Sequence, residues 1–342
     1  MKNILIPILI LTVCVAGAQS VSSPASGPGP GMRYATDAYP GFDTESDVIS
    51  PERKEPRWFQ FVTGPNCDNA TDQLAYCRQL EAEESWSKAV RQYDAIVRNW
   101  PTSAEAPEAQ RRMAEILLEK EDDAEEAFAA YRYLVDFYSF RCDYNATVDK
   151  MYEIAWRMRL EGKTIVFFRF RNTVDVRRAF EACVLRAPGA TWAPKALLTV
   201  GELREEEGRD TEAVTVYENL RNLHYGTAEA KEGVAREAQA RMRLLRDHGY
   251  NRARCVDTAA FLKLAKTLVE TDRVPEIDAA LVEAERWLEE EAYRATCFYD
   301  SRMRTRRSAA NAYEKFLKDY PNSVYADEVR ARLEALKGTE LK

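Results

Sequence analysis

Few residues in this sequence have the type and spacing that catalysis or metal binding requires. The chain holds two histidines, His224 and His248, and neither lies in a His-x-x-x-His or His-Glu pattern. Gly162-Lys163-Thr164 has the ending of a phosphate-binding loop, but Arg157 replaces the glycine required five residues earlier. We therefore expect no catalytic residue, no cofactor and no metal site, and the chain is not predicted to be an enzyme.

Two acidic runs, Glu205–Glu207 and Glu289–Glu291, are the remaining candidates for acid–base chemistry. Neighbouring residues of a helix point in different directions, so these carboxylates would not converge on one substrate. We interpret both runs as solvated helix faces.

Seven cysteines provide the other reactive groups. None of them forms a Cys-x-x-Cys pair, so a zinc or thiol-redox site is not indicated. An even number in an exported protein permits disulfides, whereas helical positions that require small residues favour buried thiols; the sequence leaves both open. Apart from Cys14, the cysteines concerned are Cys67, Cys77, Cys142, Cys183, Cys255 and Cys297.

Clustered arginines are the candidate partner-docking residues. One cluster comprises Arg302, Arg304, Arg306 and Arg307, and a second basic region comprises Arg236, Arg241, Arg243, Arg246, Arg252 and Arg254. Either these charges pair with nearby glutamates, or they form a docking face for an acidic partner or lipid headgroups. The net charge of -7 and the pI near 5.3 exclude a general nucleic-acid binder.

The N-terminus predicts export. Lys2 precedes an almost unbroken apolar run, and Ala16-Gly17-Ala18 offers the small residues that signal peptidase reads. We expect a signal peptide at 1–18, a flexible Ser/Pro/Gly-rich tether at 19–55, a repeat domain at 56–338 and a tail at 339–342.

Cys14 leaves a second mode of export open. Leu11-Thr12-Val13-Cys14 has the Leu and Cys of a bacterial lipoprotein signal, but Val13 stands where Gly, Ala or Ser is required. The mature chain is therefore expected either free in the periplasm or anchored through a lipid on Cys14 at the inner face of the outer membrane.

An internal repeat organises the helices that should position these residues. Ala89-x-x-x-Tyr93 with Pro101 eight residues later recurs as Ala309, Tyr313 and Pro321. Val176, Phe180 and Pro188 repeat the same spacing, while Ala213/Tyr217 and Ala127/Tyr131 repeat its first two terms. Small residues stand twelve positions before three of these alanines, namely Cys77, Gly201 and Cys297. These spacings predict an all-α solenoid of about five helix pairs that close on small residues.

Two stretches need separate comment. Phe167-Phe168-Arg169-Phe170-Arg171 is expected to be either a buried helix start or an exposed hot spot, and the need of a repeat core for aromatic residues favours burial. Residues 226–290 lack the repeat spacing and form a diverged region.

The small–aromatic–proline spacing resembles the tetratricopeptide repeat. The phrase Ala310-Asn-Ala-Tyr313-Glu-Lys-Phe316-Leu-Lys-Asp-Tyr320-Pro321 and the preceding Glu291–Tyr299 resemble the closing repeat of BamD-like (YfiO-type) outer-membrane assembly lipoproteins. This resemblance implies a non-enzymatic periplasmic solenoid whose partners are a β-barrel insertase and its accessory subunits. An alternative with the same fold is a scaffold for cell-wall or envelope-division machinery.

Overall fold

The computed structural model describes residues 39, 42, 64–161, 163–165, 168–170, 173–247, 251–302 and 306–338, with backbone alone for the strands and for residues 299, 301, 302, 306 and 338. The predicted signal peptide with Cys14, and most of the predicted tether, lie outside these residues.

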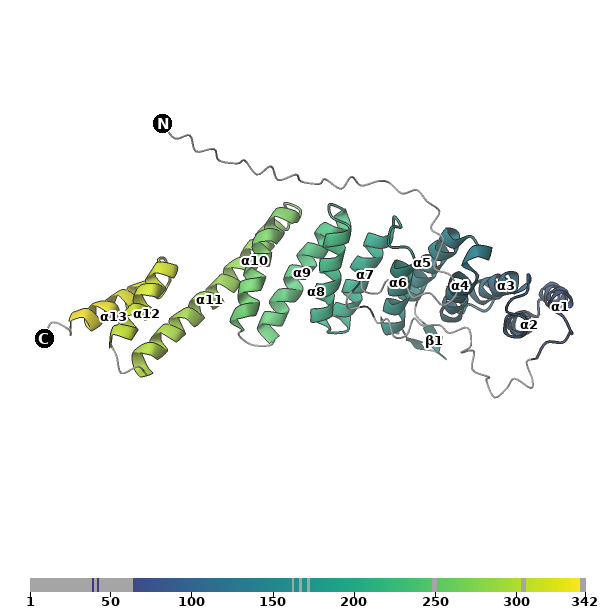
Figure 1. Ribbon diagram of the computed structural model, residues 1–342, viewed down its shortest axis with the longest axis horizontal. Coiled ribbons are helices and arrows are strands. Elements are labelled where there is room, and N and C mark those ends of the chain that lie inside the picture. Colours follow the sequence, from purple (N-terminus) through teal and green to yellow (C-terminus); the bar gives the residue numbers. More distant parts are fainter. Residues whose placement is uncertain are drawn as a thin grey trace, which may run out of the picture.

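The described chain is a row of helices, each packed against the next along the sequence (Figure 1). Some helices that are separated by one intervening helix also touch, as α7 and α9 do. This is the arrangement of a helical-repeat solenoid, which confirms the predicted fold class. The helices are α1 (Ala70–Ala82), α2 (Trp86–Asn99), α3 (Ala106–Glu119), α4 (Ala124–Tyr138), α5 (Tyr144–Glu161), α6 (Thr173–Arg186), α7 (Ala193–Glu206), α8 (Asp210–Leu223), α9 (Ala228–Asp247), α10 (Arg252–Leu268), α11 (Val274–Arg302), α12 (Arg306–Asp319) and α13 (Ala326–Gly338), with a 3₁₀ turn η5 (Ser139–Arg141).

Local sequence sets where several helices begin. The side chains of Asn69, Asp123 and Asn251 each accept a hydrogen bond from a backbone N–H of the first turn, which satisfies a donor the helix leaves unpaired. Pro107 and Pro194 lie in first turns, where a missing N–H costs nothing.

The buried side chains form three clusters along the solenoid. The first extends from α1 to the start of α9, the second joins α9, α10 and the first half of α11, and the third joins the last part of α11 to α12 and α13. The helix α11 is 29 residues long and thus belongs to two clusters. The second cluster coincides with the region where the repeat spacing is lost.

A short hairpin replaces the helix start expected just before α6. Strand β1 (Lys163–Ile165) pairs antiparallel with β2 (Phe168–Phe170), with Thr164 opposite Arg169. Aromatic and β-branched residues favour strands, which explains the departure from a continuous helical series. The side chains of Phe167–Arg171, for which burial was expected, are not among those described.

Two aromatic residues within the predicted tether at 19–55 are buried in the structure. Tyr39 and Phe42 are 5% and 8% exposed and belong to the first buried cluster. Their rings stack with centroids 5.1 Å apart, and the Phe42 N–H donates to the Tyr39 carbonyl across 3.3 Å. These two residues are buried because moving large aromatic rings out of water is favourable, even within a segment that is otherwise rich in Ser, Pro and Gly.

A buried ion network joins α6 to α7. Arg177 donates to Glu181 across 2.8 Å and to Glu207 across 2.9 Å, and Arg204 donates to Glu181 across 3.0 Å. The side chains of both arginines are almost fully buried. Removing one partner of such a network leaves a buried charge uncompensated, so these residues fix how the two helices pack.

None of the described helices has the length and apolar character needed to cross a membrane.

Candidate partner-binding pocket

The predicted repeat-packing residues lie at helix contacts. Ala89, Tyr93, Phe180, Ala213, Tyr217, Ala309 and Tyr313 are all buried, on the second helix of a pair. Cys77 is fully buried, but Cys297 is only half-buried and opens onto a pocket. The prolines Pro101, Pro188 and Pro321 are exposed in the turns that follow the helices.

Gly201 shows most directly why a small residue is needed. A Cβ atom placed on it would lie 2.2 to 2.8 Å from three atoms of the Tyr217 ring. The α7 backbone therefore touches the tyrosine of α8, and only glycine permits this approach.

Most of the first arginine cluster lies outside the residues whose side chains the structure describes. Arg304 is not described, the side chains of Arg302 and Arg306 are not described, and Arg307 is exposed. The docking role predicted for these residues stays a prediction.

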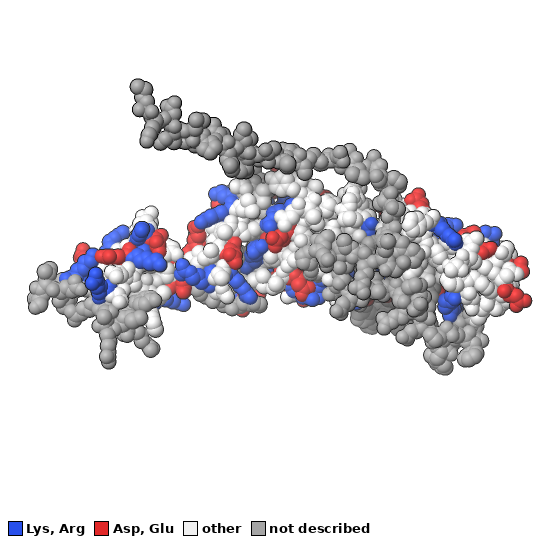
Figure 2. Space-filling model, in the orientation of Figure 1, with Lys and Arg blue, Asp and Glu red and all other residues white. Residues whose placement is uncertain are grey.

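The second basic region pairs with acidic neighbours. Arg236, Arg241, Arg243, Arg246 and Arg252 all form ion pairs with glutamates or aspartates. Figure 2 shows blue and red side chains interleaved along the visible face. Of the two interpretations left open by the sequence, local pairing describes these five arginines.

The six cysteines that follow Cys14 are free thiols in this structure. Burial raises the pKa of the Cys77 thiol to about 12, and it also raises the pKa values of Cys142 and Cys255. Buried protonated thiols are poor nucleophiles, which is consistent with packing roles for Cys77 and Cys255. The described residues contain no group of acidic, histidine and cysteine side chains arranged to hold a metal.

A polar cluster that the sequence analysis missed recurs three times. In each copy a tyrosine of the second helix follows a carboxylate by 12 or 13 residues and precedes an arginine by 19 residues, and the arginine forms an ion pair with the carboxylate. We call these the acid–tyrosine–arginine clusters. They are Glu81/Tyr93/Arg112, Glu205/Tyr217/Arg236 and Asp300/Tyr313/Arg332.

The contacts of the first and last clusters follow one plan. Tyr93 donates to Glu81, and Arg112 donates to both oxygens of the same carboxylate. Tyr313 donates to Asp300 across 3.0 Å, while Arg332 reaches its two oxygens across 2.7 and 3.3 Å. The carboxylate, tyrosine and arginine come from three successive helices, so each cluster links one helix pair to the next.

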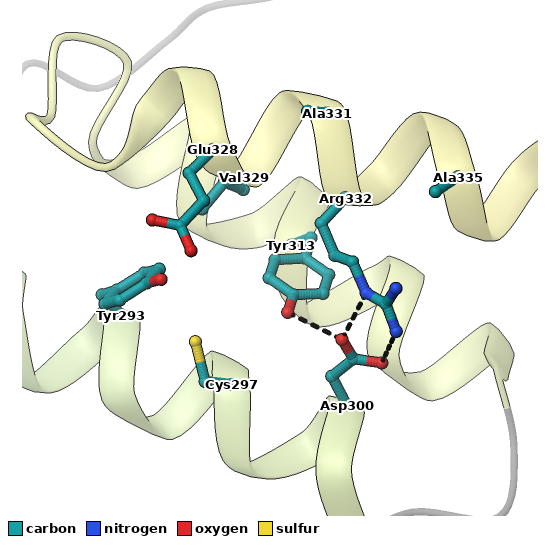
Figure 3. A pocket seen from close by; sticks show the side chains of 9 residues that line it. All are labelled: Tyr293, Cys297, Asp300, Tyr313, Glu328, Val329, Ala331, Arg332 and Ala335. Carbon is teal, nitrogen blue, oxygen red and sulfur yellow. Dashed lines mark hydrogen bonds and ion pairs between the residues drawn. The ribbon is translucent and has the colours of Figure 1, made fainter.

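The last cluster lines an open pocket of about 630 Å³ between α11, α12 and α13 (Figure 3). Tyr293, Cys297 and Asp300 come from α11 and Tyr313 from α12. The α13 helix adds Glu328, Val329, Ala331, Arg332 and Ala335. In Figure 3 the Glu328 carboxylate points toward Tyr293, apart from the hydrogen-bonded Asp300–Arg332 pair.

Titration of these groups follows from their contacts. The hydrogen bond from Arg332 lowers the pKa of Asp300 below its ordinary value. Burial, followed by the hydrogen bond to Asp300, raises the pKa of Tyr313. A hydrogen bond to Glu328 raises the pKa of Tyr293. At neutral pH the pocket therefore presents the Asp300 carboxylate and the hydroxyls of Tyr293 and Tyr313, which suits polar recognition and not nucleophilic chemistry.

Comparison with known proteins supports the repeat class. A tetratricopeptide repeat family model matches residues 293–323, the last part of α11 and the whole of α12. No curated protein matches the chain significantly.

Two solved structures match most of this chain, but with low sequence identity and low TM-scores. The C-terminal part of a TPR repeat-containing protein from Cytophaga hutchinsonii has 14% identity and a TM-score of 0.29, and the match covers 79% of this chain and 91% of that one. A tetratricopeptide repeat protein from Parabacteroides merdae has 12% identity and a TM-score of 0.27, with 78% and 98% covered. The match to the family model shows a tetratricopeptide repeat at residues 293–323, and such repeats indicate a scaffold for protein–protein interaction.

Proposed function

We propose that this chain is a non-enzymatic periplasmic scaffold, similar to the BamD-like proteins, that helps β-barrel proteins assemble into the outer membrane by binding partner proteins. The observation that carries the proposal is the closing repeat. The stretch whose residues resemble the BamD-like family is also the stretch that matches the tetratricopeptide model and forms one wall of the pocket.

The location in the periplasm rests on the N-terminal sequence. The apolar run after Lys2 and the small residues before position 19 favour export, and Cys14 would permit a lipid anchor. A scaffold at the inner face of the outer membrane would meet β-barrel precursors as they arrive.

Capture from the native envelope tests this proposal. The full-length chain, extracted in mild detergent and affinity-captured, is expected to co-purify with a large outer-membrane barrel that carries periplasmic domains. Depletion of the chain should lower the levels of other β-barrel proteins. Cell-wall or division enzymes in place of the barrel, together with unchanged β-barrel levels, would move the function to the envelope-division alternative.

A further inference from the structure

Each acid–tyrosine–arginine cluster has a fourth member, a glutamate four residues before the arginine. These glutamates are Glu108, Glu232 and Glu328. They lie one helical turn before their arginines, so they share the face that adjoins the preceding helix pair.

Each of the first two of these glutamates forms an ion pair with an arginine from another part of the chain. Arg78 of α1 donates to Glu108 across 2.6 Å. Arg273, which precedes α11, donates to Glu232 across 2.8 Å. In both copies the fourth carboxylate therefore faces a guanidinium.

The last copy lacks this guanidinium. Among the residues that the structure describes, no Lys or Arg forms an ion pair with Glu328, whose interaction partner is the Tyr293 hydroxyl. Arg78 lies 15 residues before its tyrosine, and the residue 15 before Tyr313 is Phe298, which is 53% exposed. An apolar side chain thus stands where the first repeat supplies the cation.

The charges of the residues that line the pocket also favour binding of a cation. Two carboxylates, Asp300 and Glu328, and one guanidinium, Arg332, line it, so one negative charge remains. Arg332 directs its Nε and Nη2 groups at Asp300, and this pair neutralises itself. The remaining charge is that of Glu328.

Tyrosine rings add a second element of recognition. The Tyr293 ring lies beside Glu328 in the pocket (Figure 3). It also stacks on Tyr325, with ring centroids 4.2 Å apart. A cation placed against Glu328 would also approach the Tyr293 ring, which attracts positive charge through its π electrons. The volume of about 630 Å³ lies within the ~300–1,000 Å³ range of ligand pockets.

We propose that this pocket binds a lysine or arginine side chain of a protein partner, with Glu328 and Tyr293 as the recognising groups. The partner's cation would pair with Glu328 as Arg78 pairs with Glu108 and as Arg273 pairs with Glu232. This inference rests on the proposed protein-binding function and adds the chemistry of the partner.

A peptide comparison with the full chain tests the inference. The probes are three labelled peptide pools with identical randomised flanks and Arg, Gln or Glu at the centre. The Arg pool is expected to bind about two- to fivefold more tightly than the Gln pool, which is the scale of one partly exposed ion pair. Tighter binding of the Glu pool would overturn the proposal, because Arg332 would then be the recognising group.

Matched variants locate the effect. Glu328→Gln should remove the preference for the Arg pool, whereas Glu108→Gln, at the equivalent position of the first repeat, should keep it. Phe298→Arg should also remove the preference, since it supplies the internal cation that the first repeat has. Circular dichroism checks that each variant folds. Full preference in Glu328→Gln would contradict the inference.

The two proposals fail separately. If the envelope capture finds no barrel but Glu328-dependent binding of the Arg pool persists, the pocket assignment stands and the assembly function falls. If the barrel is captured equally by the chain and by Glu328→Gln, and the Arg pool shows no preference, the assembly function stands and the pocket assignment falls.

Discussion

At the scale of single residues, the repeat depends on a few positions where the size or the charge of the residue decides the packing. Gly201 shows the requirement for a small residue most clearly, because the Tyr217 ring occupies the space that a Cβ atom would need. Asp300 is the sharpest case of charge, because it holds both Tyr313 and Arg332.

Replacing Gly201 by Ala should destabilise the protein. The added methyl group would force the Tyr217 ring or the α7 backbone to move, and overpacking of this kind costs about 1–3 kcal/mol. Gly189→Ala is the matched control, since nothing lies within 4 Å of its added Cβ. Urea unfolding should show a lower midpoint for Gly201→Ala alone; equal midpoints would show that α7 and α8 do not pack as described.

Acid should weaken the last helix pair through Asp300. The folded-state pKa of Asp300 is lowered by Arg332, so its contribution to stability is present above the unfolded-state pKa of about 3.9 and is lost as the pH falls through the folded value. Between about pH 5 and pH 3, stability should therefore fall less in Asp300→Asn than in the wild type. Asp327→Asn, whose side chain is 97% exposed, should behave as the wild type does. Thermal melting across this pH range makes the comparison, and parallel curves for the wild type and Asp300→Asn would contradict it.

Sequence spacing predicted the apolar residues of the repeat better than its polar ones. Ala89 and Tyr93 could be placed because a small residue and an aromatic at a fixed distance have one common use, the closure of a helix pair. The acid–tyrosine–arginine clusters went unnoticed because acidic and basic residues are abundant here and each has many nearby candidates for pairing. Their signal was present: an arginine stands 19 residues after Tyr93, Tyr217 and Tyr313.

At the scale of elements, α11 connects two buried clusters. Trp287 and Leu288 pack against the second cluster, and Ala292 and Tyr293 pack against the third. The change from one to the other falls at Glu289–Glu291, the acidic run that the sequence analysis interpreted as a solvated face. Helical continuity across this run sets the position of the pocket relative to the rest of the solenoid.

A helix break at this junction should uncouple the last repeat. Glu290→Pro removes a backbone hydrogen bond within α11 and costs about 3 kcal/mol or more. Glu290→Ala keeps the helix and removes the same ion pair with Arg294, so it is the control. Amide hydrogen exchange in α12 and α13 should accelerate in the proline variant alone. Unchanged exchange would show that the third cluster holds its place without α11.

Two features of the structure could not be predicted from the local sequence pattern. The β1–β2 hairpin is short, and a run of a few aromatic residues has no periodicity that separates strand from helix. Tyr39 and Phe42 stand in a stretch whose composition is that of a linker, and only tertiary contact explains their burial.

At the scale of the whole molecule, local ion pairs recur along the described part of the solenoid. The arginines of α9 are paired, and the first two fourth-position glutamates are paired with arginines. Glu328 faces the pocket beside a tyrosine hydroxyl. Of the three fourth-position glutamates, Glu328 is therefore the one left to recognise a partner's cation.

The most direct test of this account is site-specific photo-crosslinking in the native envelope. A photoreactive residue replaces Ala331, which is exposed on the pocket wall, or Val282, which is 66% exposed on α11 away from the pocket. The account predicts one discrete crosslinked protein at position 331, identified by mass spectrometry as an outer-membrane assembly barrel or its subunit, and reduced by Glu328→Gln. No product at 331, or the same products at both positions, would contradict it.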